Sequence, residues 1–262
     1  MPNLPQKDRA AQFRALHAPG RLALLPNSWD AASARIAEES GAKAIATSSA
    51  AVAWAFGYAD GEKLPKERLV ALVRDIVRVV NIPLSADSEM GFSSSPSEVA
   101  DFVVALAREG AVGINLEDGH GAPELLAAKI KEIKTAVARA GFDVFVNARA
   151  DVYLRSLVPA DRALEETLAR GRLYHDAGAD GFFVPALTDT GIMRKIADAI
   201  DLPLNVLTRK DLPPVDALKE AGVRRISAGA GIARAAYDAA RRAISEILDR
   251  GRYDAMLVDA EN

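Results

Sequence analysis

The sequence predicts an α/β protein with a (β/α)8 TIM-barrel fold. Three observations support this prediction. The chain has 262 residues, close to the roughly 250 that such barrels need. Eight short apolar segments alternate with amphipathic stretches, which favours parallel strands joined by right-handed helical crossovers. No segment is followed by a Gly-x-Gly-x-x-Gly turn, which disfavours an open doubly wound sheet. We therefore expect a single barrel domain over residues 1–262.

The eight strand candidates are too short to be helices, and most are entered through a turn containing Gly or Pro. They span residues 21–27, 42–50, 82–89, 111–118, 143–151, 179–187, 202–207 and 223–231. Apolar residues at spacings of three and four predict helices between them. These helices span 29–40, 66–80, 95–109 and 122–140, with less regular patterns over 163–177 and 188–200. Residues 230–257 predict one long final helix and a short tail with spare apolar surface.

Composition excludes several classes of function. Half of the residues are apolar, 26% are charged, and the formal net charge is −3, so the basic face that nucleic acids require is not expected. The chain has no cysteine, which excludes disulfides, thiolate metal ligands and thiol nucleophiles. No apolar run is long enough for a membrane helix, and the polar amino terminus does not look like a signal peptide. We expect a cytoplasmic protein that binds neither nucleic acid nor membrane.

Acidic side chains gather where the predicted strands end, which is where barrel enzymes carry their catalytic groups. Asp87 and Glu89 end the third segment, Glu117 ends the fourth, and Asp60 lies in the loop after the second. The two-residue period of a strand puts Asp87 and Glu89 on one face. Converging carboxylates repel one another unless a cation lies between them, and an oxygen-rich site suits Mg²⁺ or Mn²⁺. These four acids are the predicted metal site.

Other polar residues at the same end are candidates for binding a substrate. They are Thr47, Ser48, Ser49, Asn147, Arg149 and Asn205. Arg149 suits a substrate carboxylate, which a guanidinium binds through two hydrogen bonds, although it could instead neutralise Glu117. The small residues 47–50 would let backbone N–H groups reach an anion, or they form a tightly packed corner.

A proton donor is harder to choose from the sequence. His120 could act as an acid or base, or it is simply an exposed loop residue. Tyr58 follows Trp54 and Phe56, which either line a pocket or pack. His17 and His175 are expected to be structural, and Asp118 and Asp151 are expected to cap helices or form salt bridges in loops.

Four segments in this order resemble the isocitrate lyase/phosphoenolpyruvate mutase superfamily, and the resemblance runs from about residue 20 to 235. They are LPNSWDAASARIAEESGAKAIATSSAAVAWAFGYADGE, SADSEMGF, INLEDG and VNARAD. The resemblance implies a barrel whose last helix is exchanged between subunits, which here concerns about residues 232–262. It therefore implies a homodimer, or a homotetramer formed from two such dimers.

The resemblance also implies roles for individual residues. Mg²⁺ would be bound mainly through Asp87, while Asp60, Glu89 and Glu117 match positions that hold the waters of the metal. The substrate would be a 2-oxo acid or a relative, cradled by Ser48 and Ser49 and contacted by Arg149. The shared intermediate of the superfamily is a metal-bound pyruvate enolate.

The chain departs from the superfamily pattern in the loop after the fourth strand. The lyases carry a Lys-Lys/Arg-Cys-Gly-His segment there, whereas this chain has GHGAPELLA. The mutases use Lys and Asn in that loop and a His at the end of the sixth strand, where this chain has Pro185. The resemblance thus implies a Mg²⁺-dependent carbon–carbon lyase or decarboxylase, similar to an oxaloacetate decarboxylase, with His120, Tyr58 or a water as proton donor. The alternatives are a non-catalytic member that binds a 2-oxo acid and a phosphonate or carboxyphosphonate enzyme.

Overall fold

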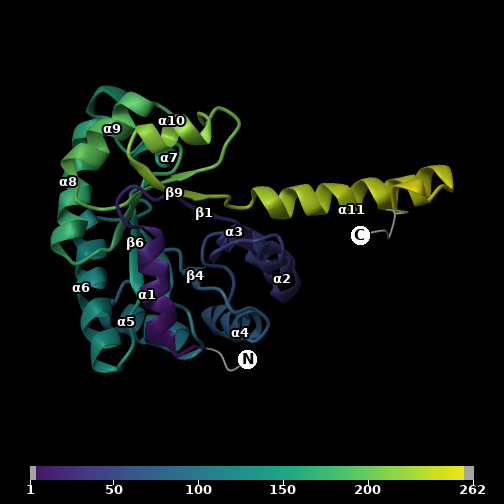
Figure 1. The fold of residues 1–262 in the computed structure, drawn as a ribbon, viewed down its shortest axis with the longest axis horizontal. Coiled ribbons are helices and arrows are strands. Elements are labelled where there is room, and N and C mark those ends of the chain that lie inside the picture. The colour runs from purple at the N-terminus through teal and green to yellow at the C-terminus, as the bar shows by residue number, and fades with distance from the viewer. Residues whose placement is uncertain (1–3, 257–262) are drawn as a thin grey trace.

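The structure is a computed structural model that describes residues 4–256, and its centre is a nearly closed barrel of parallel strands with helices around it (Figure 1). The order of the strands in the sheet is β1-β9-β8-β7-β6-β5-β4-β3-β2. The strands are β1 Ala23–Leu25, β2 Asn27–Ser28, β3 Ile45–Thr47, β4 Leu84–Asp87, β5 Gly113–Glu117, β6 Phe145–Arg149, β7 Gly181–Phe183, β8 Leu204–Leu207 and β9 Val223–Ser227. The predicted barrel is confirmed.

A ninth strand appears because the first predicted strand is divided at Pro26. The part before Pro26, β1, pairs with β9, and the part after it, β2, pairs with β3. Proline has no N–H to give to a neighbouring strand, but the Pro26 carbonyl accepts a hydrogen bond from the Ala46 N–H at 3.1 Å. The chain therefore changes its pairing partner at one residue, and this brings the two ends of the sheet together.

The helices cover the outside of the barrel and alternate with the strands along the chain. They are α1 Gln6–Leu16, α2 Ala31–Glu39, α3 Ser49–Ala55, α4 Lys66–Val77, α5 Pro96–Arg108, α6 Pro123–Arg139, α7 Val152–Arg155, α8 Ala163–Asp176, α9 Thr190–Ala199, α10 Val215–Glu220 and α11 Gly231–Arg250, with 3-10 turns at Ala160–Arg162 and Asp254–Met256. All of the predicted helices are confirmed. Helices α1, α3, α7 and α10 were not predicted, because the last three are too short to show a periodicity and α1 buries few apolar residues.

Helix α1 closes the amino-terminal end of the barrel with an aromatic plug. The ring of Phe13 packs edge-on against Phe145, at the start of β6, with 5.4 Å between centroids, and His17 stacks on Phe145 at 4.5 Å. Burial, helped by the charge of Arg225, lowers the pKa of His17 to about 3, so this histidine is neutral and structural as expected. The carboxyl ends of the strands are thus the end left for a ligand.

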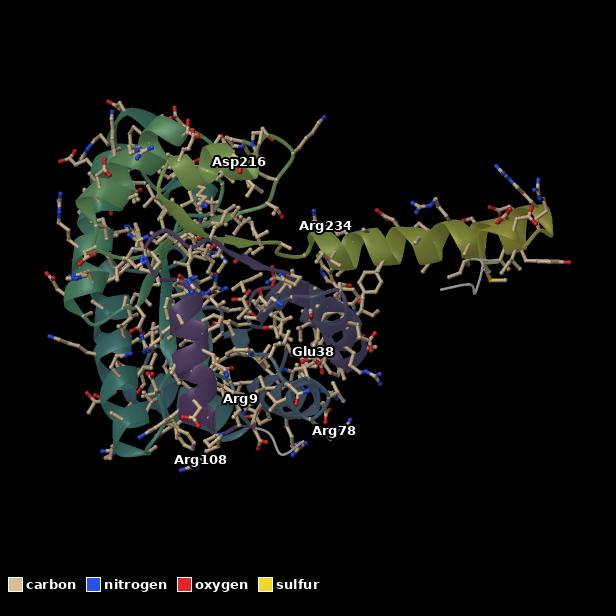
Figure 2. The ribbon with its side chains drawn as sticks, viewed as in Figure 1. Arg9, Glu38, Arg78, Arg108, Asp216 and Arg234 are labelled. Atoms are coloured by element: carbon tan, nitrogen blue, oxygen red, sulfur yellow. The ribbon has the colours of Figure 1, made fainter. Side chains whose placement is uncertain are left out.

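The final helix, α11, leaves the barrel and projects beyond it (Figure 1). Arg234 lies at its base beside the barrel (Figure 2), with its guanidinium 5.4 Å from the ring centroid of Trp54. Further along, Ile244 and Leu248 are 55% and 77% exposed. The predicted long helix with spare apolar surface is confirmed, while the end of the predicted tail, residues 257–262, lies outside the described residues. Within residues 4–256, no helix is both long and apolar enough to cross a membrane.

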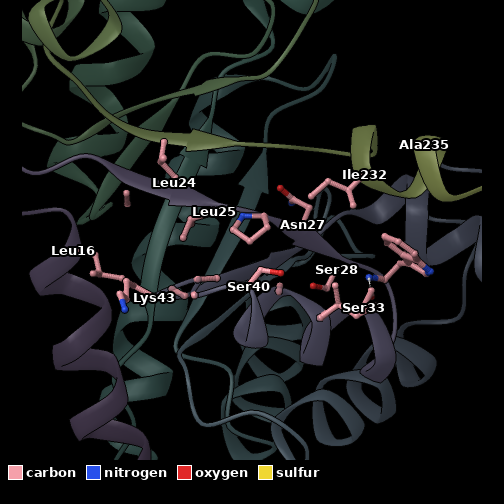
Figure 3. Close-up of a pocket in the computed structure, with 18 of the residues that line it drawn as sticks. Leu16, Leu24, Leu25, Asn27, Ser28, Ser33, Ser40, Lys43, Ile232 and Ala235 are labelled. Atoms are coloured by element: carbon pink, nitrogen blue, oxygen red, sulfur yellow. Dashed lines mark hydrogen bonds between the residues drawn. The ribbon is translucent and has the colours of Figure 1, made fainter. Parts of the chain in front are cut away.

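An apolar groove of about 810 Å³ runs along the outer face of β1 and β2. Leu24 and Leu25 of β1 line it, and Figure 3 shows Ile232 of α11 at one end. Helices α1 and α2 contribute Leu16 and Ile36 to its walls. Among residues 4–256, no helix therefore covers the outer face of the first strand, while α11 projects away from it.

Candidate active site

Asp87 is the best-positioned acid of the predicted metal site. It ends β4, beside Asn115 of β5, and its backbone N–H donates to Thr47 Oγ1 at 2.7 Å. One carboxylate oxygen, Oδ2, accepts a hydrogen bond from the Ser49 N–H at 3.0 Å. The other, Oδ1, is buried and has no hydrogen-bond partner in the described part of the chain. A buried carboxylate oxygen without a partner is costly, so Asp87 presents an oxygen that a ligand or cation would satisfy.

Glu89 lies in a strained turn immediately after Asp87. Its Oε2 accepts a hydrogen bond from the Glu62 N–H at 2.6 Å, and Glu62 Oε1 accepts one from the Phe92 N–H at 2.6 Å. All three of these residues have positive φ angles, 50° for Glu89 and 59° for Glu62 and Phe92. Left-handed backbone at non-glycine residues costs free energy and is found preferentially at functional sites. Burial, together with the charges of Asp87 and the exposed Asp60, raises the pKa of Glu89 to about 7.

Glu117 and Arg149 end the neighbouring strands β5 and β6 and form an ion pair of 2.5 Å. Their side chains are only 9% and 15% exposed. Burial raises the pKa of Glu117 to about 8, although the charge of Arg149 acts in the opposite direction. Arg149 thus pairs with Glu117, the contact that one of its two predicted roles requires. The second role, contact with a substrate, stays a prediction.

The acidic side chains of the site fit a metal ion that one protein carboxylate coordinates directly. Over residues 4–256, no three His, Asp or Glu side chains gather closely enough to chelate an ion by themselves. Asp87 nevertheless offers its unpartnered Oδ1, and burial, with a smaller contribution from the neighbouring carboxylates, raises the pKa of Glu89 and Glu117 beside it. Mg²⁺ characteristically keeps several waters and takes one or two protein carboxylates. Asp87 as ligand, with the other acids behind water, satisfies this chemistry.

A salt-bridge network behind the acidic cluster holds Arg149 in place. Arg149 Nε donates to Asp151 Oδ1 at 2.6 Å, and Arg155 Nε donates to Asp151 Oδ2 at 2.7 Å. The Asp151 N–H donates to Asp118 Oδ1 at 2.9 Å, and Asp118 Oδ2 pairs with Arg170 at 2.7 Å. Asp118 and Asp151 are thus salt-bridge partners, as predicted. The sequence analysis missed Arg155, although its spacing of four from Asp151 was a usable signal.

The predicted substrate-binding amides lie inside the barrel. Asn147 Nδ2 donates to Asn115 Oδ1 at 2.9 Å, while Asn205 Nδ2 donates to Ser227 Oγ at 3.2 Å. Arg225, which the sequence analysis missed, also donates to Asn115 Oδ1, at 3.1 Å. Its guanidinium is fully buried, and this burial lowers its pKa to about 9. The barrel interior beneath Asp87 is therefore a polar layer.

The remaining predicted residues lie around this layer. Ser48 is buried at the N-cap of α3, directly after Thr47. Tyr58 is half-buried, with the Arg68 guanidinium 6.0 Å from its ring centroid. His120 is exposed in the short connection 118–122 between β5 and α6. Within residues 4–256, no hydrogen bond joins the side chain of His120 or Tyr58 to the acids of the site, so their catalytic role stays a prediction.

The chain is a parallel α/β barrel with carboxylates and a paired arginine at the carboxyl ends of its strands. It belongs to the class of barrel proteins that carry their functional groups at this end. The apolar groove outside the barrel lacks such groups. Within this class, the chain belongs to the phosphoenolpyruvate phosphomutase family, whose sequence profile matches residues 13–248. The resemblance to the isocitrate lyase/phosphoenolpyruvate mutase superfamily is thereby confirmed.

Individual relatives agree with this assignment. An uncharacterized protein from Mycobacterium tuberculosis is 37% identical over 264 residues, which is 95% of this chain and 97% of the relative. A crystal structure from Burkholderia cenocepacia J2315, provisionally assigned as a phosphonomutase, is 38% identical with a TM-score of 0.87 and covers 91% of this chain and 100% of that one. The crystal structure of a 2,3-dimethylmalate lyase of the same superfamily is 26% identical, with a TM-score of 0.84 and coverages of 97% and 91%. The superfamily to which the chain belongs is enzymatic.

Proposed function

We propose that this protein is a Mg²⁺-dependent carbon–carbon lyase or decarboxylase that acts on a small 2-oxo or 2-hydroxy carboxylic acid. The observation that carries the proposal is the buried, unpartnered Oδ1 of Asp87 in a cluster of acids beside the Arg149 guanidinium. The similarity to a 2,3-dimethylmalate lyase supports the reaction class. The connection between β5 and α6 is short and has no cysteine. This favours a reaction that requires little proton transfer by the protein.

The acids divide into two roles under this proposal. Asp87 would hold Mg²⁺ directly, or Mn²⁺ in its place, while Asp60, Glu89 and Glu117 would hold its waters. When bound, the ion supplies Lewis-acid stabilisation of negative charge on substrate oxygens. The Ser49 N–H fixes Asp87 Oδ2, so the free oxygen of this carboxylate keeps its direction without reorganisation.

Arg149 would stabilise the negative charge that develops on the substrate as a bond to C3 breaks. Its position is set by Glu117 and Asp151 on either side. Thr47, Ser48, Ser49, Asn147 and Asn205 remain the proposed substrate-binding residues. Loss of CO₂ from a 3-carboxy-2-oxo acid needs no base at the leaving group, whereas protonation of the remaining carbon would use His120, Tyr58 or a water.

Purified protein tests the proposal against a panel of 3-carboxy-2-oxo acids and 2-hydroxy acids with Mg²⁺. We expect release of pyruvate or glyoxylate, and we expect Asp87→Ala to abolish it. The matched control is Asp161→Asn, which alters an exposed acid outside the proposed metal and substrate sites and should leave turnover unchanged. Stabilisation by a 2-oxo acid without any turnover would instead identify the chain as a non-catalytic binding member.

A phosphonate substrate is the second candidate, because the 38% identical crystal structure carries a provisional phosphonomutase assignment. The chain lacks the mutase loop residues and has Pro185 where the mutases have a histidine. Incubation with phosphonopyruvate and Mg²⁺ separates the candidates. Formation of inorganic phosphate or phosphoenolpyruvate would favour phosphonate chemistry over carbon–carbon cleavage.

A homodimer formed by exchange of α11, or a homotetramer of two such dimers, is the proposed assembly. Apolar side chains recur on one side of the projecting helix, including Ile244, Ile247 and Leu248. The groove over β1 and β2 is apolar and lies next to the base of that helix. Exchange would cover both surfaces at once, and such burial is the main favourable contribution to association.

A further inference from the structure

A second guanidinium, that of Arg155, lies on the solvent-facing side of the acidic site, and the proposed reaction does not use it. Its Nε donates to Asp151 Oδ2 at 2.7 Å, and its Nη2 lies 3.7 Å from Glu117 Oε1. The Arg155 side chain is 35% exposed, against 15% for Arg149. Of the two cations beside Glu117, Arg155 is therefore the more accessible to solvent.

Arg149 has fewer N–H groups left for a ligand than Arg155 has. A guanidinium has five N–H groups, and Arg149 uses Nε and Nη2 on Asp151, at 2.6 and 3.1 Å, and Nη1 on Glu117. Arg155 uses only Nε, and neither of its terminal nitrogens donates a hydrogen bond to residues 4–256. The free donors of this part of the site thus belong mainly to Arg155.

The backbone holds Arg155 more firmly than an ordinary surface arginine. It ends the four-residue helix α7, and its N–H donates to the Asp151 carbonyl at 2.9 Å. The next residue, Ser156, is left-handed, with φ 49° and ψ 51°, a conformation that surrounding contacts must maintain in a non-glycine residue. Asp151, to which the side chain is tied, has a fully buried carboxylate. These contacts fix the base of Arg155 and direct its guanidinium toward Glu117.

Two acids and two guanidinium groups lie together in this part of the site. Glu117 and Asp151 pair with Arg149 and Arg155, and the remaining acids face the proposed metal. A ligand with one carboxylate would be satisfied by the metal and Arg149. A second anionic group would need another cation with unused N–H groups. Arg155 has the positive charge and the unused N–H groups.

We propose that Arg155 is a specificity-determining residue that binds a second anionic group, a carboxylate or a phosphonate, at the distal end of the substrate. The 2-oxo acid end would lie at Asp87 and Arg149, so this inference rests on the proposed function. Arg155 thereby selects substrates with two anionic groups over those with one.

Ligand affinity in the presence of Mg²⁺ tests the inference. The dissociation constants of pyruvate, 3,3-difluorooxaloacetate and phosphonopyruvate are measured by calorimetry for wild type, Arg155→Gln and Arg155→Lys. We expect Arg155→Gln to weaken the two ligands with a distal anion about tenfold or more and to leave pyruvate near its wild-type affinity. Arg155→Lys keeps the charge without the paired donors, so its losses should be smaller. If Arg155→Gln costs more affinity for 3,3-difluorooxaloacetate, the natural distal group is a carboxylate. If it costs more affinity for phosphonopyruvate, the natural distal group is a phosphonate.

The control is Arg162→Gln, because the Arg162 side chain is 66% exposed and pairs at 3.8 Å with the exposed Glu165; it should change none of the three affinities. Thermal unfolding of each variant verifies that it is folded. If Arg155→Gln weakens pyruvate as much as the other two ligands, or weakens none of them, the inference is overturned while the proposed function stands. If the wild type binds none of the three ligands, the proposed function fails and this inference falls with it.

Discussion

Arg170 of α8 reaches the carboxylate of Asp118 at the end of β5, with 2.7 Å between Nη1 and Oδ2. The hydroxyl of Tyr174 donates to the same oxygen at 2.6 Å, and the Asp118 side chain is fully buried. Through the Asp151 N–H, this pair is connected to the residue that positions Arg149. Helix α8, on the outside of the barrel, thus helps to position Arg149 at the carboxyl ends of the strands.

We expect Asp118→Asn to lower the free energy of unfolding by about 3 kcal/mol, because it removes the buried carboxylate that Arg170 and Tyr174 share and leaves the largely buried Arg170 paired only with the half-buried Glu166. Urea denaturation measures the change. The control is Glu165→Gln, which breaks an exposed ion pair with Arg162 and should cost less than about 1 kcal/mol. Equal effects of the two substitutions would contradict the supporting role of Asp118.

The sequence predicted the barrel and the acids that end its neighbouring strands, because both depend on local patterns. Strand ends lie at one end of a parallel barrel, so Asp87, Glu89 and Glu117 could be grouped without knowing any distance. The contacts of Arg225 and Arg170 could not be predicted in this way. Their partners, Asn115 and Asp118, are 110 and 52 residues away, and no periodicity relates such positions.

Metal affinity should rise with pH between about 6 and 8. Without metal, burial raises the pKa of Glu89 to about 7 and that of Glu117 to about 8, so both carry protons below this range. A divalent cation favours the ionised carboxylates and displaces those protons. The apparent Kd for Mg²⁺ should therefore fall by up to about tenfold per pH unit for each proton released, and level off above pH 8.

Calorimetry in two buffers of different ionisation enthalpy counts the protons released on Mg²⁺ binding. Glu89→Gln, which cannot ionise, should release fewer protons and show a weaker dependence on pH. A Kd that is constant from pH 6 to 8 would show that these acids do not respond to the metal.

Gly113 permits the aromatic plug at the amino-terminal end of the barrel. A Cβ at this position would lie 2.9 Å from Phe13 Cε1 and 3.1 Å from Ser85 Oγ. We expect Gly113→Ala to cost about 1–3 kcal/mol of stability through overpacking. In a Phe13→Leu background the added methyl has more room, so the same substitution should cost less. A double-mutant cycle by urea denaturation measures this coupling, and additive costs would mean that Phe13 is not the residue that limits the space.

Leu248 gives the sharpest test of how α11 is used, because it is 77% exposed on a projecting helix. If a second copy covers the apolar side of α11, Leu248→Asp buries an unpaired charge in that interface and should shift the protein toward monomers. Sedimentation velocity over a range of protein concentrations measures the shift. Arg242→Asp is the matched control, because Arg242 is exposed and lies roughly opposite the apolar side at 100° per residue. It introduces the same carboxylate and should leave the assembly unchanged. Identical sedimentation of both variants and wild type would mean that this side of α11 does not join subunits.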